Sequence, residues 1–463
     1  MTFLKNTLYV LAANFLILAL SFFLRPFTAR FLGPAEYGLF ALILSTATVI
    51  QAFNLFSINS GVLYYSAKKP ASLKKIVSSS LAFVVIISVL LYYPLQTLVS
   101  SIIPSIGSGS FAVALALSAF LSFFSILQAA QQGLEKFRAY SIYSIASALL
   151  AGLASVAIAY VIPDGTMASL ARAFAILAVS LSGLVSLKAI GKQDFKEFKR
   201  IFAYSFPLGL TGFLGAFVVI ADRYLIAAFH SVSEVGFYDA AYSMIAAVLP
   251  FSTALLTTMM PRVIKQYSKL RFYYEKISQA NAILLTSAGL VFFYYSDIFV
   301  TILLGNGYEQ AVLPFKILSL SLPLMALYSL NVSSAAAVGK TKFSGLQMSL
   351  LTVFSFVFNF LLVPSLGVVG ASWANLFTYV FTCAIGFYYL KTRYGTGITH
   401  VLPQYAFFAV FILAYVLFLS PGGFVAKTLL LLVFGAVTYF ANKGIVAEVL
   451  GSLASMALRK GKL

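Results

Sequence analysis

The sequence predicts an all-α integral membrane protein with about fourteen transmembrane helices. Hydrophobic residues make up 61% of the 463 residues and charged residues only 9%, whereas soluble domains carry about 25% charged residues. Mean hydropathy is +0.97. Apolar runs of about 20 residues, the length of a membrane-spanning helix, recur along the whole chain. We therefore expect a multi-pass protein of the cell membrane.

The expected spans follow one another with short connections. We place them at 8–30, 38–62, 76–98, 110–131, 141–162, 167–188, 204–229, 236–260, 279–304, 312–337, 345–363, 368–390, 401–420 and 423–441. The first run is too long for a signal peptide and ends in charge without a small-residue cleavage site. No connection exceeds about 20 residues, which leaves no room for a soluble catalytic domain.

Basic residues lie in alternate connections. Together with the termini, the connections at 68–75, 135–138, 188–200, 262–276, 340–342 and 391–393 hold 25 of the 31 lysines and arginines. Since positive charge marks the cytoplasmic side, an even number of spans with both termini inside fits every connection. The net charge of +19 is thus scattered over short loops, which does not suit a nucleic-acid-binding face.

Residues 24–45 are repeated in residues 222–243, at an offset of 198. Identical pairs include Arg25/Arg223, Phe31/Phe229, Glu36/Glu234, Gly38/Gly236 and Ser45/Ser243. A second match, "GLEKF" (133–137) to "GKTKF" (339–343), has an offset of 206. Two lobes of six spans with the same orientation suit a transporter that rocks about a central cavity. The expected division is 1–190, a basic linker 191–203, a second lobe 204–390, and two further helices with a basic tail, 391–463.

Both repeated turns carry helix-capping signals. In "GPAEYG", Gly33 can end a helix, Pro34 suits the first position of the next, and Glu36 meets a positive helix end. Ser231 and Glu234 have capping-box spacing. We expect these glutamates to be structural, with a substrate role as the alternative.

The segments "FLGPAEYGLFAL" (31–42) and "YSFPLGLTGFLGAFVVIADRYLIAAFHSVSEVGFYDAAYSM" (204–244) resemble the Wzx-type polysaccharide transporters. These are lipid-linked oligosaccharide flippases of the multidrug/oligosaccharidyl-lipid/polysaccharide (MOP) exporter superfamily. The resemblance implies two bundles packed in a V and alternating access. It also implies a cargo of sugars on an isoprenoid phosphate or diphosphate.

Five basic residues fall in the outer half of the expected spans. They are Arg25, Arg30, Arg172, Arg223 and Lys316. One interpretation is a cationic cavity for a lipid phosphate, which the planar guanidinium can bind through two hydrogen bonds. The alternative is that a long side chain reaches the outer headgroups. We favour the cavity for Arg25, Arg172 and Arg223, and the headgroups for Arg30 and Lys316.

Polar side chains accompany these cations. Asn14 and Ser21 share a helical face with Arg25, and Gln51 and Asn54 follow at a step of three. They are expected to line the cavity, or else to form interhelical hydrogen bonds.

One acid, Asp222, lies well inside a span. It is expected either to pair with an arginine or to take part in H⁺ or Na⁺ coupling. Because adjacent helical residues point about 100° apart, Asp222 and Arg223 are expected to meet different neighbours.

The remaining composition argues against other functions. Cys383 is the single cysteine, and His230 and His400 lie far apart, so we expect no disulfide, metal or cofactor. With twelve acids in all, an enzyme is disfavoured. A multidrug or cation antiporter would want carboxylates inside the first lobe, where none lies in a span. Lipid II flipping is a closer alternative. The function we expect is a flippase that acts as a monomer, and its partners are membrane lipids and a lipid-linked oligosaccharide.

Overall fold

The computed structural model describes residues 2–252, 270–337, 340–396, 401–419 and 424–442. Throughout these ranges the secondary structure is helical and no strand occurs, which confirms the all-α prediction. The end of the expected span 236–260, the basic connection up to residue 269 and the tail from residue 443 lie outside the described residues.

The N-terminal bundle consists of seven helical elements. They are α1 (Thr2–Leu55), α2 (Ile58–Lys68), a 3-10 turn (Pro70–Ser72), α3 (Leu73–Ile102), α4 (Ser108–Gly133), α5 (Phe137–Val161) and α6 (Gly165–Ser186). Inside α1, Gly33 has φ 73° and ψ 168°, a combination open essentially to glycine alone. The chain folds back there, so α1 supplies both of the first two expected spans. Span 38–62 is itself divided at Phe56 and Ser57, which have positive φ.

The long helix α7 (Phe195–Phe229) leads into the C-terminal bundle. This bundle contains α8 (Val232–Ala246), α10 (Leu270–Tyr294), α11 (Ser296–Leu303), a 3-10 turn (Glu309–Ala311), α12 (Val312–Ala337) and α13 (Thr341–Tyr394). Gly367, with φ 54° and ψ −134°, breaks α13 as Gly33 breaks α1. Two late expected spans, 345–363 and 368–390, are therefore the two halves of α13.

Nine helices among the described residues are long and apolar enough to cross a membrane. Two of them, 12–55 and 342–394, have 44 and 53 residues, or about 66 and 80 Å at 1.5 Å per residue. Each is more than twice the roughly 30 Å hydrocarbon core, and each is folded at its glycine. The total of fourteen spans, the cytoplasmic termini and the domain boundaries stay predictions.

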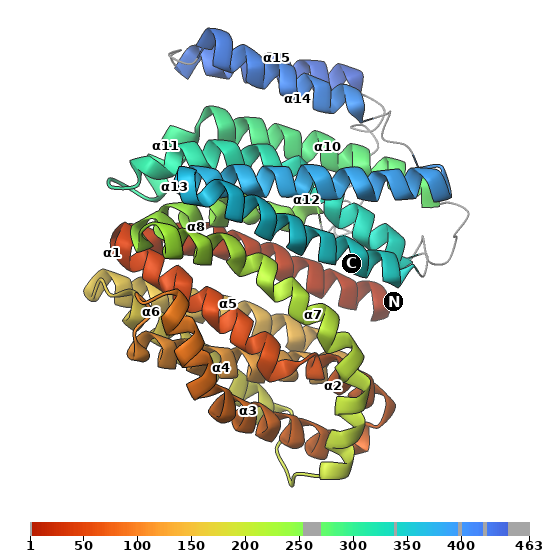
Figure 1. Ribbon diagram of the computed structural model, residues 1–463. Coiled ribbons are helices and arrows are strands. Elements are labelled where there is room, and N and C mark those ends of the chain that lie inside the picture. The colour runs from red at the N-terminus through yellow and green to blue at the C-terminus, as the bar shows by residue number, and fades with distance from the viewer. Residues whose placement is uncertain (1, 253–269, 338–339, 397–400, 420–423, 443–463) are drawn as a thin grey trace, which may run out of the picture.

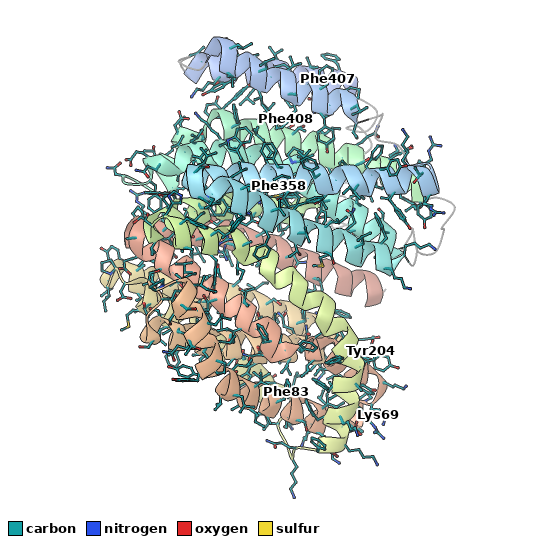
Figure 2. The ribbon with its side chains drawn as sticks, viewed as in Figure 1. Lys69, Phe83, Tyr204, Phe358, Phe407 and Phe408 are labelled. Carbon is teal, nitrogen blue, oxygen red and sulfur yellow. The ribbon has the colours of Figure 1, made fainter. Side chains whose placement is uncertain are left out.

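Helix α7 connects the two bundles. Near its start Tyr204 stacks on Tyr64 of α2 with ring centroids 4.7 Å apart, whereas near its end Phe229 contacts Phe360 of α13. Figure 1 shows α7 crossing obliquely from α2 and α3 toward α8 and α13. Figure 2 places Tyr204 at the same end of the molecule as Lys69, which is the expected cytoplasmic end.

The last two helices pack on the outside of the C-terminal bundle. They are α14 (Leu402–Ala414), which continues as a π-helical turn (Tyr415–Leu419), and α15 (Phe424–Ala441). Figures 1 and 2 show them beyond α10, on the side away from the N-terminal bundle, with Phe408 facing that helix. Phe408 packs with Leu290 and Phe293 of α10, and the Tyr294 hydroxyl donates to the Phe411 carbonyl at 2.7 Å.

Candidate functional site

The two repeated turns meet each other where the bundles join. A Cβ atom added to Gly38 of α1 would overlap the carbonyl oxygen of Val232, and one added to Gly236 of α8 would overlap that of Pro34. Both Gly38/Gly236 and Pro34/Val232 are separated by 198 residues. The contact is therefore reciprocal, as in an interface across a twofold axis, and only glycine permits this approach of the two backbones.

The repeated glutamates cap equivalent helices. The Glu36 carboxylate accepts a hydrogen bond from the Gly165 amide, at the start of α6, at 2.8 Å. The Glu234 carboxylate accepts one from the Val368 amide, where α13 restarts, at 3.2 Å. Ser231 also accepts from the Glu234 amide, as its spacing predicts. The structural role expected for both glutamates is confirmed, and each acts on a helix distant in sequence.

A buried charged cluster lies below the glycine contact. Arg223 donates to Asp239 from Nε at 2.8 Å and from Nη2 at 2.6 Å, and to Asp222 from Nη1 at 3.2 Å. Tyr37 of the N-terminal bundle donates to the other oxygen of Asp239 at 3.0 Å. The exposed fractions of Arg223, Asp222 and Asp239 are 4%, 6% and 6%. The cluster thus joins the two bundles away from water.

The expectation that Asp222 and Arg223 meet different neighbours is wrong. One oxygen of Asp222 accepts both the backbone amide and the guanidinium of Arg223. The arginine side chain is long enough to curl back over its predecessor while its other face binds Asp239. The guanidinium also lies 5.7 Å and 5.1 Å from the ring centroids of Tyr238 and Tyr242, close enough for cation–π attraction.

Arg25 and Arg172 are differently placed. They lie close enough together for their charges to interact, and the charge of Arg25 also acts on Asp239. Across the described ranges neither forms a hydrogen bond or an ion pair. Counting 1.5 Å per residue, Arg25 lies about 12 Å before Gly33, Arg172 about 10 Å after Gly165, and Arg223 about 9 Å before the end of α7. The structure thus brings these three arginines to similar depth.

The other two predicted cations lie elsewhere. Arg30 is exposed and its Nη1 donates to the Ile302 carbonyl at the end of α11 at 3.2 Å. Lys316 is 3.9 Å from Asp297, which also pairs with Lys427 of α15 at 3.2 Å. Arg30 therefore links the two bundles at the ends where the repeated turns meet, and Lys316 faces the C-terminal helix pair rather than the buried cluster.

The predicted polar lining divides into two groups. Asn14 is exposed and Ser21 partly buried on the first half of α1. Gln51 donates to Ser125 at 3.2 Å and Asn54 to Ser118 at 3.0 Å. Interhelical hydrogen bonding, the alternative for these two amides, is confirmed.

The C-terminal bundle contains a cavity of about 200 Å³. Its lining comprises Asp222, Arg223, Tyr242, Tyr328, Met348, Leu351, Ser355, Asn359, Asn375, Thr378 and Tyr379. Within the described part of the chain, the side-chain oxygens of Asn359 and Asn375 are buried without a hydrogen-bond partner. Asn359 and Asn375 stand out in the sequence as amides within apolar spans, but their meeting with Asp222 was not predicted, because the fold at Gly367 brings the two halves of α13 together.

Known proteins with similar sequences include archaeal membrane proteins. The probable low-salt glycan biosynthesis flippase Agl15 of Haloferax volcanii is 24% identical over 247 residues, which are 52% of this chain and 50% of that protein. An uncharacterized membrane protein of Methanocaldococcus jannaschii is 25% identical over 204 residues, 44% of this chain and 49% of that protein. The chain thus spans about half the length of the curated relatives it matches.

Solved structures show the same fold. The lipid II flippase MurJ, in an inward closed conformation, matches 92% of this chain and 98% of its own with a TM-score of 0.74 and 13% identity. An outward-facing multidrug resistance MATE transporter of the MOP superfamily matches 84% and 95%, with a TM-score of 0.56 and 15% identity.

The family model for polysaccharide biosynthesis proteins matches residues 27–313. These residues include both repeated turns, the buried cluster, Arg172 and Arg223, whereas Arg25 lies two residues before the matched range. The chain is a multi-pass integral membrane protein, which in a prokaryote places it in the plasma membrane, and it belongs to the polysaccharide biosynthesis protein family.

Proposed function

We propose that this chain is a transporter that moves an isoprenoid-phosphate- or diphosphate-linked oligosaccharide from the inner to the outer leaflet by alternating access. The observation that carries the proposal is the pair Arg25 and Arg172, two cations at one depth without a counter-ion in the described structure. Family membership and the relative named as a probable glycan biosynthesis flippase support it. Both bundles belong to one chain, and we propose that it acts as a monomer.

The unpaired arginines indicate an anionic cargo. An arginine within a membrane helix costs about 2.5–3.5 kcal/mol on insertion scales. An arginine that has no acid beside it is therefore stabilised most by a ligand that brings a negative charge. The phosphate of a lipid carrier can accept paired hydrogen bonds from each guanidinium. The acids of residues 1–190 are Glu36, Glu135 and Asp164, all at helix ends or in connections. Within residues 1–190 a cationic drug would find no acid at the depth of these arginines.

The outer ends of the bundles are held together by several contacts. Besides the glycine contact, the Tyr308 hydroxyl donates to the Ala29 carbonyl at 2.8 Å, and Arg30 binds the Ile302 carbonyl. Figure 1 shows α2–α4 and α12–α13 diverging toward the opposite end. With the basic connections on the cytoplasmic side, as predicted, this arrangement would receive cargo from inside, and transport would require these outer contacts to break.

The cavity beside Asp222 is suited to a coupling cation. Carboxylate, amide and hydroxyl oxygens are the ligands of hard cations, and the cavity lining offers them from Asp222, Asn359, Asn375 and Thr378. A Na⁺ ion or proton on Asp222 would compete with Arg223 for the same carboxylate. We propose that this competition loosens the cluster between Arg223 and Tyr37 and so couples the ion to the interface.

Transport into proteoliposomes tests the function. Three cargoes are compared: a polyprenyl-diphosphate-linked neutral oligosaccharide, lipid II and a lipophilic cationic dye. We expect the first to be moved fastest, and Arg25→Gln and Arg172→Gln each to slow it at least tenfold. Arg138→Gln, at an exposed cytoplasmic position, is the matched control. If both variants moved the oligosaccharide lipid as fast as the control, the anion site would be refuted. If the wild-type chain moved lipid II or the dye faster than the oligosaccharide lipid, the cargo would be another one.

A further inference from the structure

A second pocket, of about 140 Å³, lies between α2 and α4 at the end of the bundle next to the basic connections. Five of its seven lining residues have uncharged polar side chains. The lining comprises Asn59, Ser60, Leu63, Ser125, Gln128, Ala129 and Gln132. On α4 the polar members follow at steps of three and four, so they form one stripe on one helix face.

The polar groups of this pocket are only partly used by the protein. Gln128 donates to Ser144 of α5 at 2.7 Å, and Ser125 accepts from Gln51 of α1 at 3.2 Å. These bonds fix two of the side chains against neighbouring helices. No described side chain or backbone group hydrogen-bonds the side chains of the three other polar members, Asn59, Ser60 and Gln132.

We propose that this pocket binds one neutral sugar ring of the transported glycan. An amide offers donors and an acceptor together, which matches sugar hydroxyls, and the lining carries no charge that would select a phosphate or a cation. Polar side chains on membrane helices face water or a binding partner rather than lipid. The volume of 140 Å³ is about ten times that needed by one water molecule, enough for a single ring and too small for an oligosaccharide.

The pocket lies far from the arginine pair. Arg25 is eight residues before the fold at Gly33, so its depth corresponds to residue 41 on the returning segment. From there to the end of α1 at Leu55 is 14 residues, or about 21 Å of helix, and Asn59 lies beyond it in α2. The inference rests on the proposed function: with the phosphate at Arg25 and Arg172, the pocket would contact a sugar several units away. It would therefore select glycans by their length.

Binding of two synthetic lipids to the purified full chain in detergent tests this inference. One is a polyprenyl diphosphate carrying a single N-acetylglucosamine, and the other carries a linear neutral hexasaccharide. Asn59→Leu and Gln132→Leu remove the amides that have no described partner. Gln131→Leu is the matched control, because Gln131 is a fully buried neighbour on α4 whose amide is unpaired among the described residues and does not line the pocket.

We expect each pocket variant to weaken binding of the hexasaccharide lipid about fivefold, the effect of one lost hydrogen bond, and to leave the single-sugar lipid and the control unchanged. Equal weakening for both lipids, or none, would overturn the inference. If the wild-type chain bound neither lipid, the proposed function would fail on its own. Alkylation of Asn59→Cys in a Cys383→Ala background would then decide: protection by free hexasaccharide supports the pocket, and lack of protection rejects it.

Discussion

The reciprocal glycine contact predicts that a single side chain can open the outer side of the protein. In Gly38→Val, the new Cβ would overlap the Val232 carbonyl oxygen and lie 3.0 Å from the Gly236 amide nitrogen. Ordinary carbon contacts are about 3.5–4.0 Å. Since the obstacle is backbone, no change of rotamer relieves the overlap, and the two turns must move apart.

The expected effect is large enough to measure. Overpacking of a tight contact costs about 1–3 kcal/mol. The contact joins the outer ends of the bundles, so this cost applies to the closed arrangement and disappears when the ends separate. A change of that size shifts the ratio of open to closed populations by about 5- to 150-fold.

Cysteine labelling from outside measures this shift. Ser243 is 5% exposed and lies against Tyr37, directly below the glycine contact. The labelled protein carries Ser243→Cys in a Cys383→Ala background. Adding Gly38→Val should make this cysteine react about 5- to 150-fold faster with a membrane-impermeant maleimide. Gly109→Val is the control, because an added Cβ there meets nothing within 4 Å. Unchanged labelling in a folded Gly38→Val protein, or equal acceleration in the control, would refute the reasoning.

Four further predictions concern other contacts. Asp239→Leu leaves Arg223 with one acid and should lower the apparent Tm, because a buried charge without its partner costs about 3–5 kcal/mol. Adding Arg223→Met should restore part of the lost Tm. Additive losses of Tm in this double-mutant cycle would contradict the pairing. Glu36→Ala and Glu234→Ala should each cost about 1 kcal/mol of stability through the lost cap, and an unchanged Tm in either would exclude the capping role. The Lys75 hydrogen bond and the amides of Glu197 and Lys196 hold the pKa of Asp194 below its usual 3.8. The contribution of the Asp194 carboxylate to stability is therefore complete above about pH 4 and is lost as the pH falls through the lowered pKa. Asp194→Ala should then lower Tm at neutral pH, and the deficit should shrink as the pH falls through the lowered pKa of Asp194. A deficit that does not change with acidification would contradict this. Asn359→Leu should abolish any dependence of transport on a Na⁺ or proton gradient. Asn281 is buried but lies outside the cavity, so Asn281→Leu should leave that dependence unchanged. Equal effects of the two substitutions would reject the cation site.

Hydropathy located the helices because the bilayer requires apolar runs of fixed length. The expected spans 110–131 and 167–188 correspond to α4 (Ser108–Gly133) and α6 (Gly165–Ser186). Helix α7 begins nine residues before its expected start at 204. There the Asp194 side chain caps the helix, and the Phe198 and Phe202 rings pack on Phe83 of α3. This segment of nine residues holds two lysines and an arginine, so hydropathy does not reveal it as part of the helix.

The site was predictable only as a set of residue types. Polar and charged residues within apolar spans marked Arg25, Arg172 and Asp222, since such residues are costly in lipid. Their partners depend on distances between helices that no local pattern encodes. The polar stripe of α4 at 118–132 was also visible in the sequence at helical spacing, but it was not singled out.

The two arginines that the repeat pairs, Arg25 and Arg223, have different surroundings. Arg223 is tied to two acids, whereas its counterpart Arg25 has no described partner. The residues of the N-terminal bundle that correspond to those two acids, 198 positions earlier, are Leu24 and Ala41. Because the acids lie beside Arg223 only, we expect an anion to bind Arg25 in preference to Arg223.

The helices capped by the two glutamates extend this difference. Seven residues after the capped amide of Gly165 stands Arg172, and seven residues after that of Val368 stands Asn375. The equivalent positions thus hold a cation, Arg172, in the N-terminal bundle and a neutral amide, Asn375, in the C-terminal bundle. Asn375 lines the same cavity as Asp222. Such a pattern suits a phosphate in the first bundle and a coupling cation in the second. The two sites would then communicate through the Tyr37–Asp239 hydrogen bond between the bundles, because that bond must break when the bundles part.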